Sequence, residues 1–208
     1  MKITIIGATK GIGKEVMKQA IEQGNDVTVL ARNQSKVNKP DVKVIQGDFL
    51  NENHVKQSVK EAEVVVISVG MLPTFKPVNL FSKGTRNLIN AIKELQTNPL
   101  IIAVTGIGAG DSVGHGGFFY DKIMNPLLLK TIYQDKNKQE QILKNEYDNW
   151  IVVRPGFLTN GTLTQTYKSI TDLKGVTAGK ISRADVADFI LKQAKSPEFL
   201  KQTPLLTY

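Results

Sequence analysis

The sequence predicts an α/β fold in which helices cover both faces of one parallel sheet, a doubly wound arrangement. Short apolar runs alternate with segments of helical periodicity along the whole chain, as in repeated βαβ units. The run Val64–Val69 is nearly all apolar, as expected of a strand that is covered on both faces. The length of 208 residues, without a linker or an internal repeat, predicts a single domain over residues 1–208.

The expected elements follow from these runs in chain order. Strands are expected at Ile3–Ile6, Val27–Leu30, Val42–Ile45, Val64–Val69, Leu100–Val104 and Trp150–Val153, with Leu205 and Leu206 closing the sheet. Helices are expected after Gly13, over Asn51–Ala62 and Asn79–Leu95, within Asn125–Tyr147, and from a capping box of Ser182 and Asp185. Strands that are joined by helices in this way run parallel to one another.

A glycine-rich turn connects the first strand to the first helix. Gly7 follows the strand directly, and Gly11 and Gly13 lie where the helix begins. A helix N-terminus offers unpaired N–H groups and partial positive charge, which attract phosphate. Glycine lets the phosphate approach the backbone and allows the helix to pack closely on the strand. The turn therefore predicts the pyrophosphate site of a dinucleotide, against the alternative of an ordinary strand-to-helix turn.

The end of the second strand indicates which dinucleotide is bound. Folds that prefer NAD place an Asp or Glu there to receive the ribose 2′-hydroxyl, whereas this chain has Arg32. Asp26 does not substitute, because it opens the strand rather than closing it. A guanidinium suits a 2′-phosphate in charge and geometry. Lys10 and Lys36 can add positive charge, although both also fit ordinary surface lysines. The sequence predicts NADP(H) in preference to NAD(H).

The other strand ends complete the expected cofactor site. In open α/β sheets, ligands bind beyond the carboxyl ends of the strands, where the strand order reverses. Asp48 can bond an adenine amine or simply start a helix, Ser68 and Gly70 leave room for a ribose, and Thr105 can support the nicotinamide. The residues expected along this edge are Gly7, Arg32, Asp48, Ser68, Gly70, Thr105, Gly106, Pro155 and Gly156.

A glycine-rich loop, residues 106–117, follows the fifth strand. It cannot pack a core of its own, so near the strand ends it is expected to be a lid or substrate wall, or else a mobile connector. Phe157, just after the sixth strand, is expected to flank the acceptor together with this loop. No metal site is expected, because His54, on a helix expected to be exposed, and His115 are distant in sequence and give no ligand spacing.

Composition narrows the class of protein further. Lys and Arg number 27 against 19 Asp and Glu, a net charge of +8. The lysines are spread along the chain, so a solvated surface and an anionic cofactor explain them better than nucleic-acid binding. No apolar stretch approaches the roughly 20 residues of a membrane span, no signal peptide is recognisable, and cysteine is absent. These features predict a cytoplasmic protein that binds neither nucleic acid nor membrane.

Several short motifs together resemble the short-chain dehydrogenase/reductase superfamily over essentially the whole chain. They are Gly7-Ala8-Thr9, Val29–Arg32, Gly47-Asp48, Gly84–Asn87, Trp150–Gly156 and Ile181–Ala187. More narrowly, the chain is similar to the atypical branch of small NAD(P)H-binding proteins, which includes NADH-flavin reductases and biliverdin-IXβ/flavin reductases and borders on NmrA-like proteins. The resemblance implies that the cofactor is bound by Gly7, Thr9, Lys10, Gly11, Ile12 and Gly13 (pyrophosphate), Arg32 (2′-phosphate), Asp48 and Phe49 (adenine), and Ser68, Val69 and Gly70 (ribose).

Two features depart from that branch. Lys10 stands where members of that branch usually have glycine. The loop follows instead the GxxxGxG pattern of typical superfamily members, in which a basic residue before the second glycine accompanies a preference for NADP. The superfamily's catalytic Tyr-x-x-x-Lys is also incomplete, because Ile132 precedes Lys136 by four residues. Tyr133 and Lys136 are three apart, which still places both on one helix face. The two are either a variant catalytic pair, or the tyrosine is structural.

Three functions are compatible with these residues. The first is an NADP(H)-dependent oxidoreductase that transfers hydride to a small acceptor such as a flavin or quinone, which needs little acid catalysis. The second is a non-catalytic NADP(H)-sensing regulator of NmrA-like type. The third and weakest is an epimerase or other isomerase, for which the chain supplies few proton-transfer residues. Either a monomer or a homodimer is compatible with the sequence.

Overall fold

The computed structural model describes residues 1–37 and 39–208. Within them, one eight-stranded sheet has the order β3-β2-β1-β4-β5-β6-β10-β8. Its strands are β1 (Lys2–Ile6), β2 (Asp26–Ala31), β3 (Val42–Gln46), β4 (Val64–Ile67), β5 (Leu100–Val104), β6 (Trp150–Pro155), β8 (Lys168–Ile170) and β10 (Leu205–Thr207). All neighbours pair in parallel except β10 with β8. The predicted doubly wound parallel sheet is confirmed.

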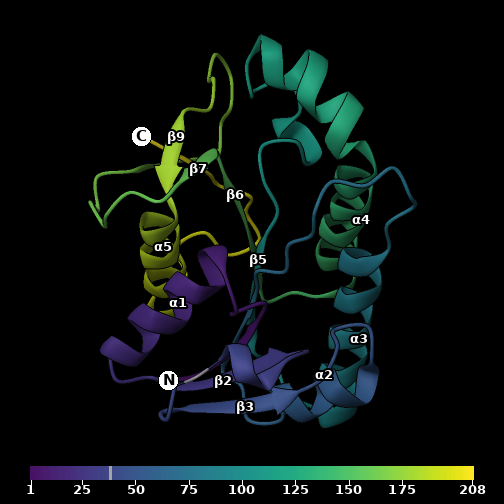
Figure 1. The fold of residues 1–208 in the computed structure, drawn as a ribbon, viewed down its shortest axis with the longest axis vertical. Helices are drawn as coiled ribbons and strands as arrows, with labels where there is room; N and C mark the ends of the chain where they lie inside the picture. The colour runs from purple at the N-terminus through teal and green to yellow at the C-terminus, as the bar shows by residue number, and fades with distance from the viewer. Residues whose placement is uncertain (38) are drawn as a thin grey trace.

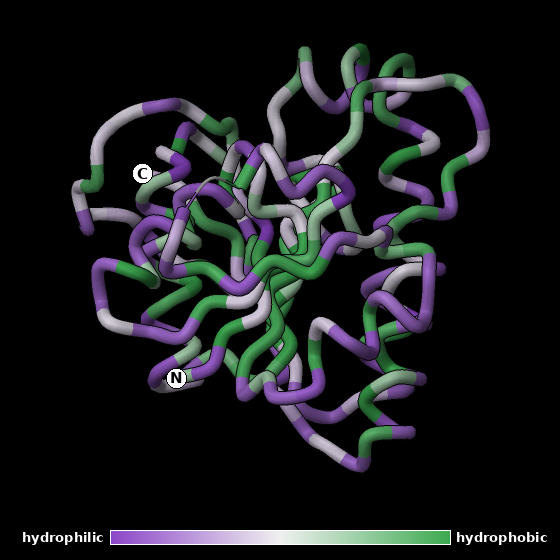
Figure 2. The backbone as a smooth tube through the Cα atoms, turned by 60° about the horizontal axis from the view of Figure 1, so that its bottom comes forward, coloured by the Kyte–Doolittle hydropathy of each residue, from purple (hydrophilic) through white to green (hydrophobic). Residues whose placement is uncertain are grey.

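Helices cover both faces of this sheet (Figure 1). On one face lie α1 (Gly11–Glu22) and α5 (Arg183–Lys195), and on the other lie α2 (Glu52–Val59), α3 (Leu80–Leu95) and α4 (Lys130–Glu146). Each face has its own hydrophobic core, and the apolar central strands between them are visible in Figure 2. The expected inner face of the first helix is confirmed: Val16, Met17 and Ala20 are buried and Ile21 partly so.

The long helix that we expected within Asn125–Tyr147 divides into two segments. A π-helical segment, η3 (Tyr120–Leu129), contains Pro126 and leads into α4. Proline lacks an N–H and clashes with the carbonyl four residues earlier, so regular α-helix begins only beyond it. The helix predicted over Asn51–Ala62 is α2, which Asn51 caps by accepting a hydrogen bond from the His54 N–H at 3.1 Å.

Three short strands were not predicted. A separate two-stranded parallel sheet consists of β7 (Phe157–Thr159) and β9 (Lys180–Ser182). The expectation that Leu205 and Leu206 close the main sheet is wrong, because β10 has β6 on one side and β8 on the other. The three strands that were not predicted are β7, β8 and β9. Each has only three residues, which is too short for an alternating pattern to be recognised.

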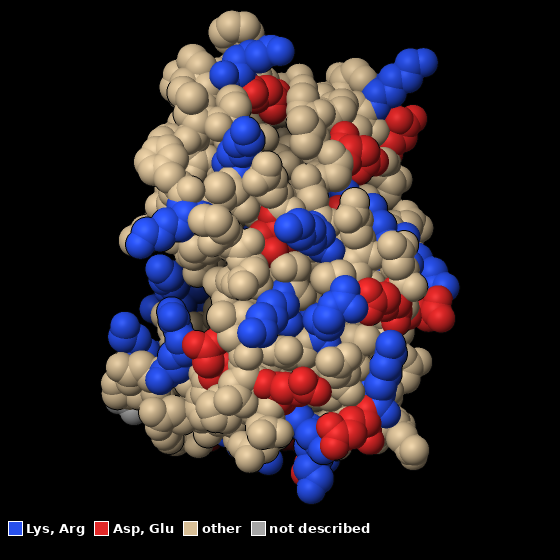
Figure 3. Space-filling view, turned by 90° about the vertical axis from the view of Figure 1, so that its right-hand side faces the viewer, with Lys and Arg blue, Asp and Glu red and all other residues tan. Residues whose placement is uncertain are grey.

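The surface over α3 and α4 carries mixed charge. In the view of Figure 3, Lys and Arg side chains stand among Asp and Glu side chains rather than forming one uniformly basic field. No helix in the described part of the chain combines the length and the apolar character that crossing a bilayer requires.

Candidate functional site

The candidate site begins where the strand order reverses, between β1 and β4. Gly7 leaves β1 with φ of +100°, and a Cβ atom placed on it would lie 2.6 Å from the Ser68 carbonyl oxygen at the end of β4. A Cβ on Gly13 would lie 2.2 Å from the Gly7 carbonyl oxygen. Only glycine fits at either position, so the turn holds the start of α1 directly against the end of β1.

The first turn of α1 is open to an anion. Lys10 occupies the N-cap in an extended conformation, and its side chain forms no capping hydrogen bond. The first turn also contains no acidic residue. Gly11 has φ of +63°, a left-handed conformation that favours glycine. Uncapped amide groups at a helix N-terminus fit a pyrophosphate, so these residues satisfy the chemistry that a dinucleotide requires.

Two basic side chains flank this turn. Arg32 comes directly after β2 and Lys10 directly before α1, and both are exposed. Neither forms an ion pair with any residue that the structure describes. Their charges are therefore available to a ligand at this edge. Lys36 is also exposed, in the short helix η1 (Gln34–Lys36) that follows.

The residues expected around the adenine differ in accessibility. Asp48 is half-buried, and its Oδ1 accepts a hydrogen bond from the Leu50 N–H at 2.9 Å. Phe49 lies instead in the core, where its ring would be 2.2 Å from a Cβ on Gly84 of α3. Only its backbone can border a ligand. His54, expected on an exposed helix, is half-buried, and its Nδ1 accepts the Asp48 N–H at 3.2 Å.

The expected ribose residues follow β4. Ser68 and Val69 are half-buried, whereas Gly70 is exposed, and no atom lies within 4 Å of a Cβ placed on Gly70. Ser68 adjoins Gly7, which places this segment beside the glycine turn. The structure therefore brings the turn and the end of β4 together at one point of the edge.

Thr105 ends β5 above a buried ionic network. Its hydroxyl donates to Glu140 Oε1 at 2.8 Å. Arg154, which has no exposed surface, donates to the same carboxylate from Nε at 3.1 Å and from Nη2 at 2.6 Å. Burial opposes the charge of Arg154, but hydrogen bonds and attraction to Glu140 and Asp111 outweigh it and raise its pKa. The Thr105 hydroxyl thus points beneath the edge, toward this network.

This network was missed at the level of sequence. Arg154 stands in the otherwise apolar strand β6, and Glu140 lies on the buried side of α4. A charged residue in a buried strand requires a partner of opposite charge. The presence of Arg154 in this strand was therefore a signal in the sequence that a buried ion pair exists. No spacing rule identifies that partner, because Glu140 and Asp111 come from a helix and a loop elsewhere in the chain.

Lys136 lies under the end of β5. Its Nζ donates to the carbonyl oxygen of Thr105 at 2.5 Å and, more weakly, to that of Val104 at 3.4 Å. Burial lowers the pKa of Lys136 to about 8, although attraction to Glu140 partly opposes the shift. Its ammonium also lies 5.1 Å from the centre of the Phe81 ring. Burial thus makes the Lys136 ammonium a stronger acid than that of an ordinary lysine, beside the candidate edge.

Tyr133 does not form the superfamily's pair with Lys136. The Tyr133 hydroxyl accepts a hydrogen bond from the Tyr120 hydroxyl at 2.9 Å, and burial raises the pKa of Tyr133. The Lys136 ammonium lies 5.9 Å from the centre of the Tyr133 ring and is bonded to backbone carbonyls. The two side chains share a helix, as predicted, but a phenol with a raised pKa is a poor proton donor or base.

Tyr120 and Phe157 extend this aromatic cluster towards β7. Their rings meet edge to face with centres 5.4 Å apart. Tyr120 had no motif around it, and only the fold brings it beside Tyr133. Pro155 and Gly156 end β6 below the cluster, and the Gly156 N–H donates to the Leu206 carbonyl oxygen at 2.9 Å. The cluster and the end of β6 form one side of the candidate acceptor region.

The glycine-rich loop 106–117 is held at several points. The Gly110 N–H donates to Asn137 Oδ1 at 2.8 Å, and Asp111 pairs with Arg154. His115 Nδ1 lies 2.8 Å from the Val176 carbonyl oxygen, and Gly106 leaves space that the Tyr133 hydroxyl fills. The loop is thus packed against its surroundings, and its role as a lid stays a prediction. Phe118 and Phe119, which directly follow the loop in sequence, are exposed apolar side chains.

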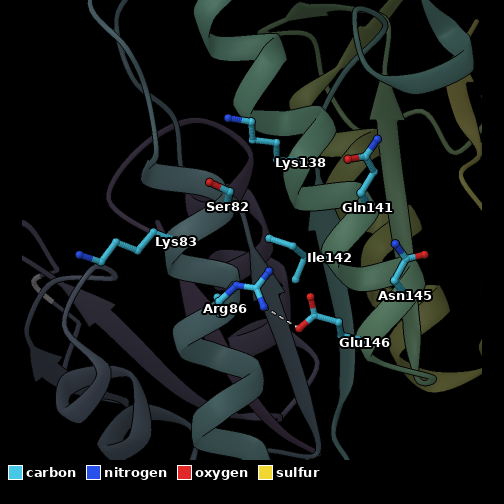
Figure 4. A pocket seen from close by; sticks show the side chains of 8 residues that line it. All are labelled: Ser82, Lys83, Arg86, Lys138, Gln141, Ile142, Asn145 and Glu146. Carbon is cyan, nitrogen blue, oxygen red and sulfur yellow. Dashed lines mark hydrogen bonds and ion pairs between the residues drawn. The ribbon is translucent and has the colours of Figure 1, made fainter.

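A groove of about 490 Å³ lies away from the strand ends, between α3 and α4. Figure 4 shows that Arg86 and Glu146 reach towards each other across it, 2.9 Å apart. The groove was not predicted, and none of the expected site residues lines it. The lining residues are Ser82, Lys83, Arg86, Lys138, Gln141, Ile142, Asn145 and Glu146.

The sheet order, the glycine turn at its switch point and the open helix N-terminus define a nucleotide-binding protein of the Rossmann type. The chain belongs to the NAD(P)H-binding family, whose pattern it matches over residues 7–197. The predicted resemblance is confirmed at this level.

Several known proteins are similar to the chain. An uncharacterized protein of Bacillus subtilis (strain 168), YwnB, is 29% identical over 213 residues, which cover 95% of this chain and 94% of that protein. The anaerobilin reductase ChuY of Escherichia coli O157:H7 superimposes with a TM-score of 0.84 at 22% identity, covering 100% and 97% of the two chains. A short-chain dehydrogenase/reductase of Veillonella parvula DSM 2008, in complex with NADP, gives 0.78 at 18% identity, covering 100% and 94%. At these identities the two structures show a shared fold.

Proposed function

We propose that the protein is an NADPH-dependent oxidoreductase that reduces a small conjugated acceptor such as a flavin or a quinone. The observation that carries the proposal is that two exposed cations, Lys10 directly before α1 and Arg32 directly after β2, have no ion-pair partner among the described residues. A 2′-phosphate and a pyrophosphate together require this combination of charge and free amide groups. Membership of the NAD(P)H-binding family supports the cofactor class.

Each part of the cofactor has residues that would hold it. The glycine turn would bind the pyrophosphate through backbone amides. Because the Ile12 side chain is buried and Thr9 is half-buried, these residues would contribute their backbone N–H groups. Arg32 and Lys10 would bind the 2′-phosphate. The segment after β4 would border the ribose, and Asp48 with the backbone of Phe49 would border the adenine. The nicotinamide end would lie near Thr105, Gly106, Pro155, Gly156 and Phe157.

The acceptor side suits a flat, apolar molecule. The Phe157 ring and the exposed apolar side chains near the loop offer contact surface. Bound NADPH supplies the hydride in such a reaction. The reduced acceptor also takes up a proton. Lys136 would donate this proton, because its lowered pKa lets it do so near neutral pH, and it would then be reprotonated by water. Burial raises the pKa of Tyr133 and so makes its hydroxyl a weak proton donor, which favours acceptors that need little acid catalysis.

One experiment tests the proposal directly. The purified protein is mixed with NADPH and FMN, and separately with a soluble quinone, and the loss of nicotinamide absorbance is followed. We expect turnover that is faster with NADPH than with NADH at equal concentration. Tight NADPH binding without turnover across a broad panel of acceptors would rule the enzyme proposal out.

A non-catalytic cofactor sensor is the second candidate. It is favoured by one observation: the hydroxyl of Tyr133 and the ammonium of Lys136 both have partners within the protein rather than each other. A sensor would bind NADPH and NADP⁺ with similar affinity and would retain a protein partner in a pull-down. Catalytic turnover, or a strong preference for one redox state, would argue against it.

A further inference from the structure

The chain's arginines fall into two groups by their partners. Arg86 pairs with Glu146 at 2.9 Å, and Arg154 pairs with Glu140 at 2.6 Å. Arg32 and Arg183 have no carboxylate partner among residues 1–37 and 39–208. Arg32 lies at the candidate cofactor edge. Arg183 was not assigned any role from the sequence, and its surroundings give it one.

The backbone of Arg183 is fixed by buried hydrogen bonds. Arg183 is the first residue of α5, and Ser182 caps that helix by accepting the Asp185 N–H at 3.0 Å. Asp185 has no exposed surface and accepts a further bond from the Tyr208 hydroxyl at 2.6 Å. The start of α5 therefore has one well-defined position.

The side chain of Arg183 extends from that position to the glycine turn. A Cβ atom on Gly11 would lie 3.9 Å from Nε of Arg183. The Nη1 atom donates to Asn160 Oδ1 at 2.7 Å, which leaves other donors of the guanidinium free. Gln19 of α1 donates to the Ala184 carbonyl oxygen at 2.9 Å and ties the two helices together. The guanidinium is thus held beside the first residue of α1.

Arg183 and Arg32 approach the turn from different sides. Arg32 follows β2, which lies on one side of β1 in the sheet, whereas α5 packs against β5 on the other side. Figure 1 shows α5 standing beside α1 on the same face of the sheet. A 2′-phosphate bound by Arg32 would therefore be distant from Arg183, while a pyrophosphate on the amides of Gly11 would be adjacent to it.

We propose that Arg183 is a pyrophosphate-binding residue, which neutralises the diphosphate bridge of the dinucleotide from the side opposite Arg32. The proposal rests on cofactor binding within the proposed function and does not require turnover. A guanidinium provides two parallel donors to a phosphate group. Both NADPH and NADH carry the diphosphate bridge, so Arg183 serves both, whereas Arg32 distinguishes between them.

The test compares three ligands by calorimetric titration of the full chain. NADPH and NADH contain the pyrophosphate, whereas adenosine 2′-monophosphate has the adenine, the ribose and the 2′-phosphate assigned to Arg32 but lacks the diphosphate bridge. We expect Arg183→Ala to weaken NADPH and NADH by the same factor, about tenfold for a lost charge-assisted hydrogen bond. Adenosine 2′-monophosphate should bind as in wild type. Arg183→Lys, which keeps the charge but not the planar fork, should lose less.

Arg86→Ala is the matched control, because it removes an arginine from the distant groove between α3 and α4 and should leave all three affinities unchanged. Unaltered NADH affinity in Arg183→Ala, or a loss confined to NADPH, would overturn the proposal. An equal loss for adenosine 2′-monophosphate, with a lower melting temperature, would show a structural role instead. If wild type binds both dinucleotides but reduces no acceptor, the enzyme proposal fails while the assignment of Arg183 is still decided by these titrations.

Discussion

Arg154 and Glu140 face each other in the interior, joined by hydrogen bonds of 3.1 Å and 2.6 Å to the two carboxylate oxygens. The pair connects β6 to α4 directly beneath the glycine-rich loop, and both side chains are almost completely buried. Thr105 at the end of β5 shares the carboxylate. One ion pair therefore links the candidate nicotinamide end of the edge, the helix that carries Lys136 and the loop above them.

Glu140→Gln should destabilise the protein strongly. The substitution removes the buried negative charge and leaves Arg154 with the more exposed Asp111 as its remaining counter-ion, and breaking a buried pair in this way costs roughly 3–5 kcal/mol of unfolding free energy. Urea denaturation measures the change. Glu146→Gln is the control, because its pair with Arg86 lies at the surface (Figure 4) and should contribute less than about 1 kcal/mol. Similar losses of unfolding free energy in both variants would show that the buried pair stabilises the fold no more than the surface pair does.

Asp111→Ala should loosen the loop without unfolding the protein. Arg154 keeps Glu140 in this variant, so the fold retains its buried pair, but the loop loses its ionic attachment. Amide hydrogen exchange in residues 106–117 should become faster, while exchange in α3 stays as in wild type. Asp148→Ala removes an acid from the exposed pair with Lys201 and serves as the control. Unchanged exchange in the loop would mean that its other contacts suffice to hold it.

Arg32→Ala should alter cofactor preference. If Arg32 binds the 2′-phosphate, NADPH affinity falls roughly tenfold to a hundredfold, as expected for a hydrogen bond to a charged group, while NADH affinity is unchanged. Thermal-shift titration with both cofactors measures this. Lys36→Ala, four residues further along the chain, should have a smaller effect. A wild-type protein that prefers NADH would contradict the assignment of Arg32 to the 2′-phosphate.

Turnover should depend on the protonation of Lys136. In the proposed reaction the ammonium form is the proton donor, and this form predominates below its pKa of about 8. The value of kcat/KM is therefore expected to fall as the pH rises through that value. Lys136→Met should be slower at neutral pH and should lose this inflection, whereas Lys138→Met, on an exposed part of the same helix, should keep it. A wild-type profile without an inflection near pH 8 would remove Lys136 from proton transfer.

The sequence was most informative where one local pattern determines one local structure. The glycine turn, Arg32 after β2 and the strand–helix alternation each follow from spacing within a few residues, and the structure has them as predicted. Phe49 shows the limit of this reasoning: its position after β3 was correct, but its side chain turns into the core against Gly84. Which way a side chain points depends on what packs there, and spacing does not contain that information.

Contacts between distant segments could not be predicted in the same way. Tyr120 meets Tyr133 because the π-helical segment η3 leads its chain back over α4. Arg183 reaches Gly11 because α5 packs on α1. The strands β7 and β9 are recognisable only as partners of each other. In each case the interaction joins two separate segments, and no spacing rule within either segment identifies its partner.

The contrast between Gly13 and Arg32 has an evolutionary consequence. A side chain on Gly13 would collide with the backbone of Gly7, so the glycine turn itself cannot change without disturbing the fold. Arg32 is exposed and has no partner within the described chain, so its replacement should cost little stability. If Arg32 holds the 2′-phosphate as proposed, one substitution at this exposed position would let descendants of this protein draw on the other nicotinamide pool, while the scaffold persists.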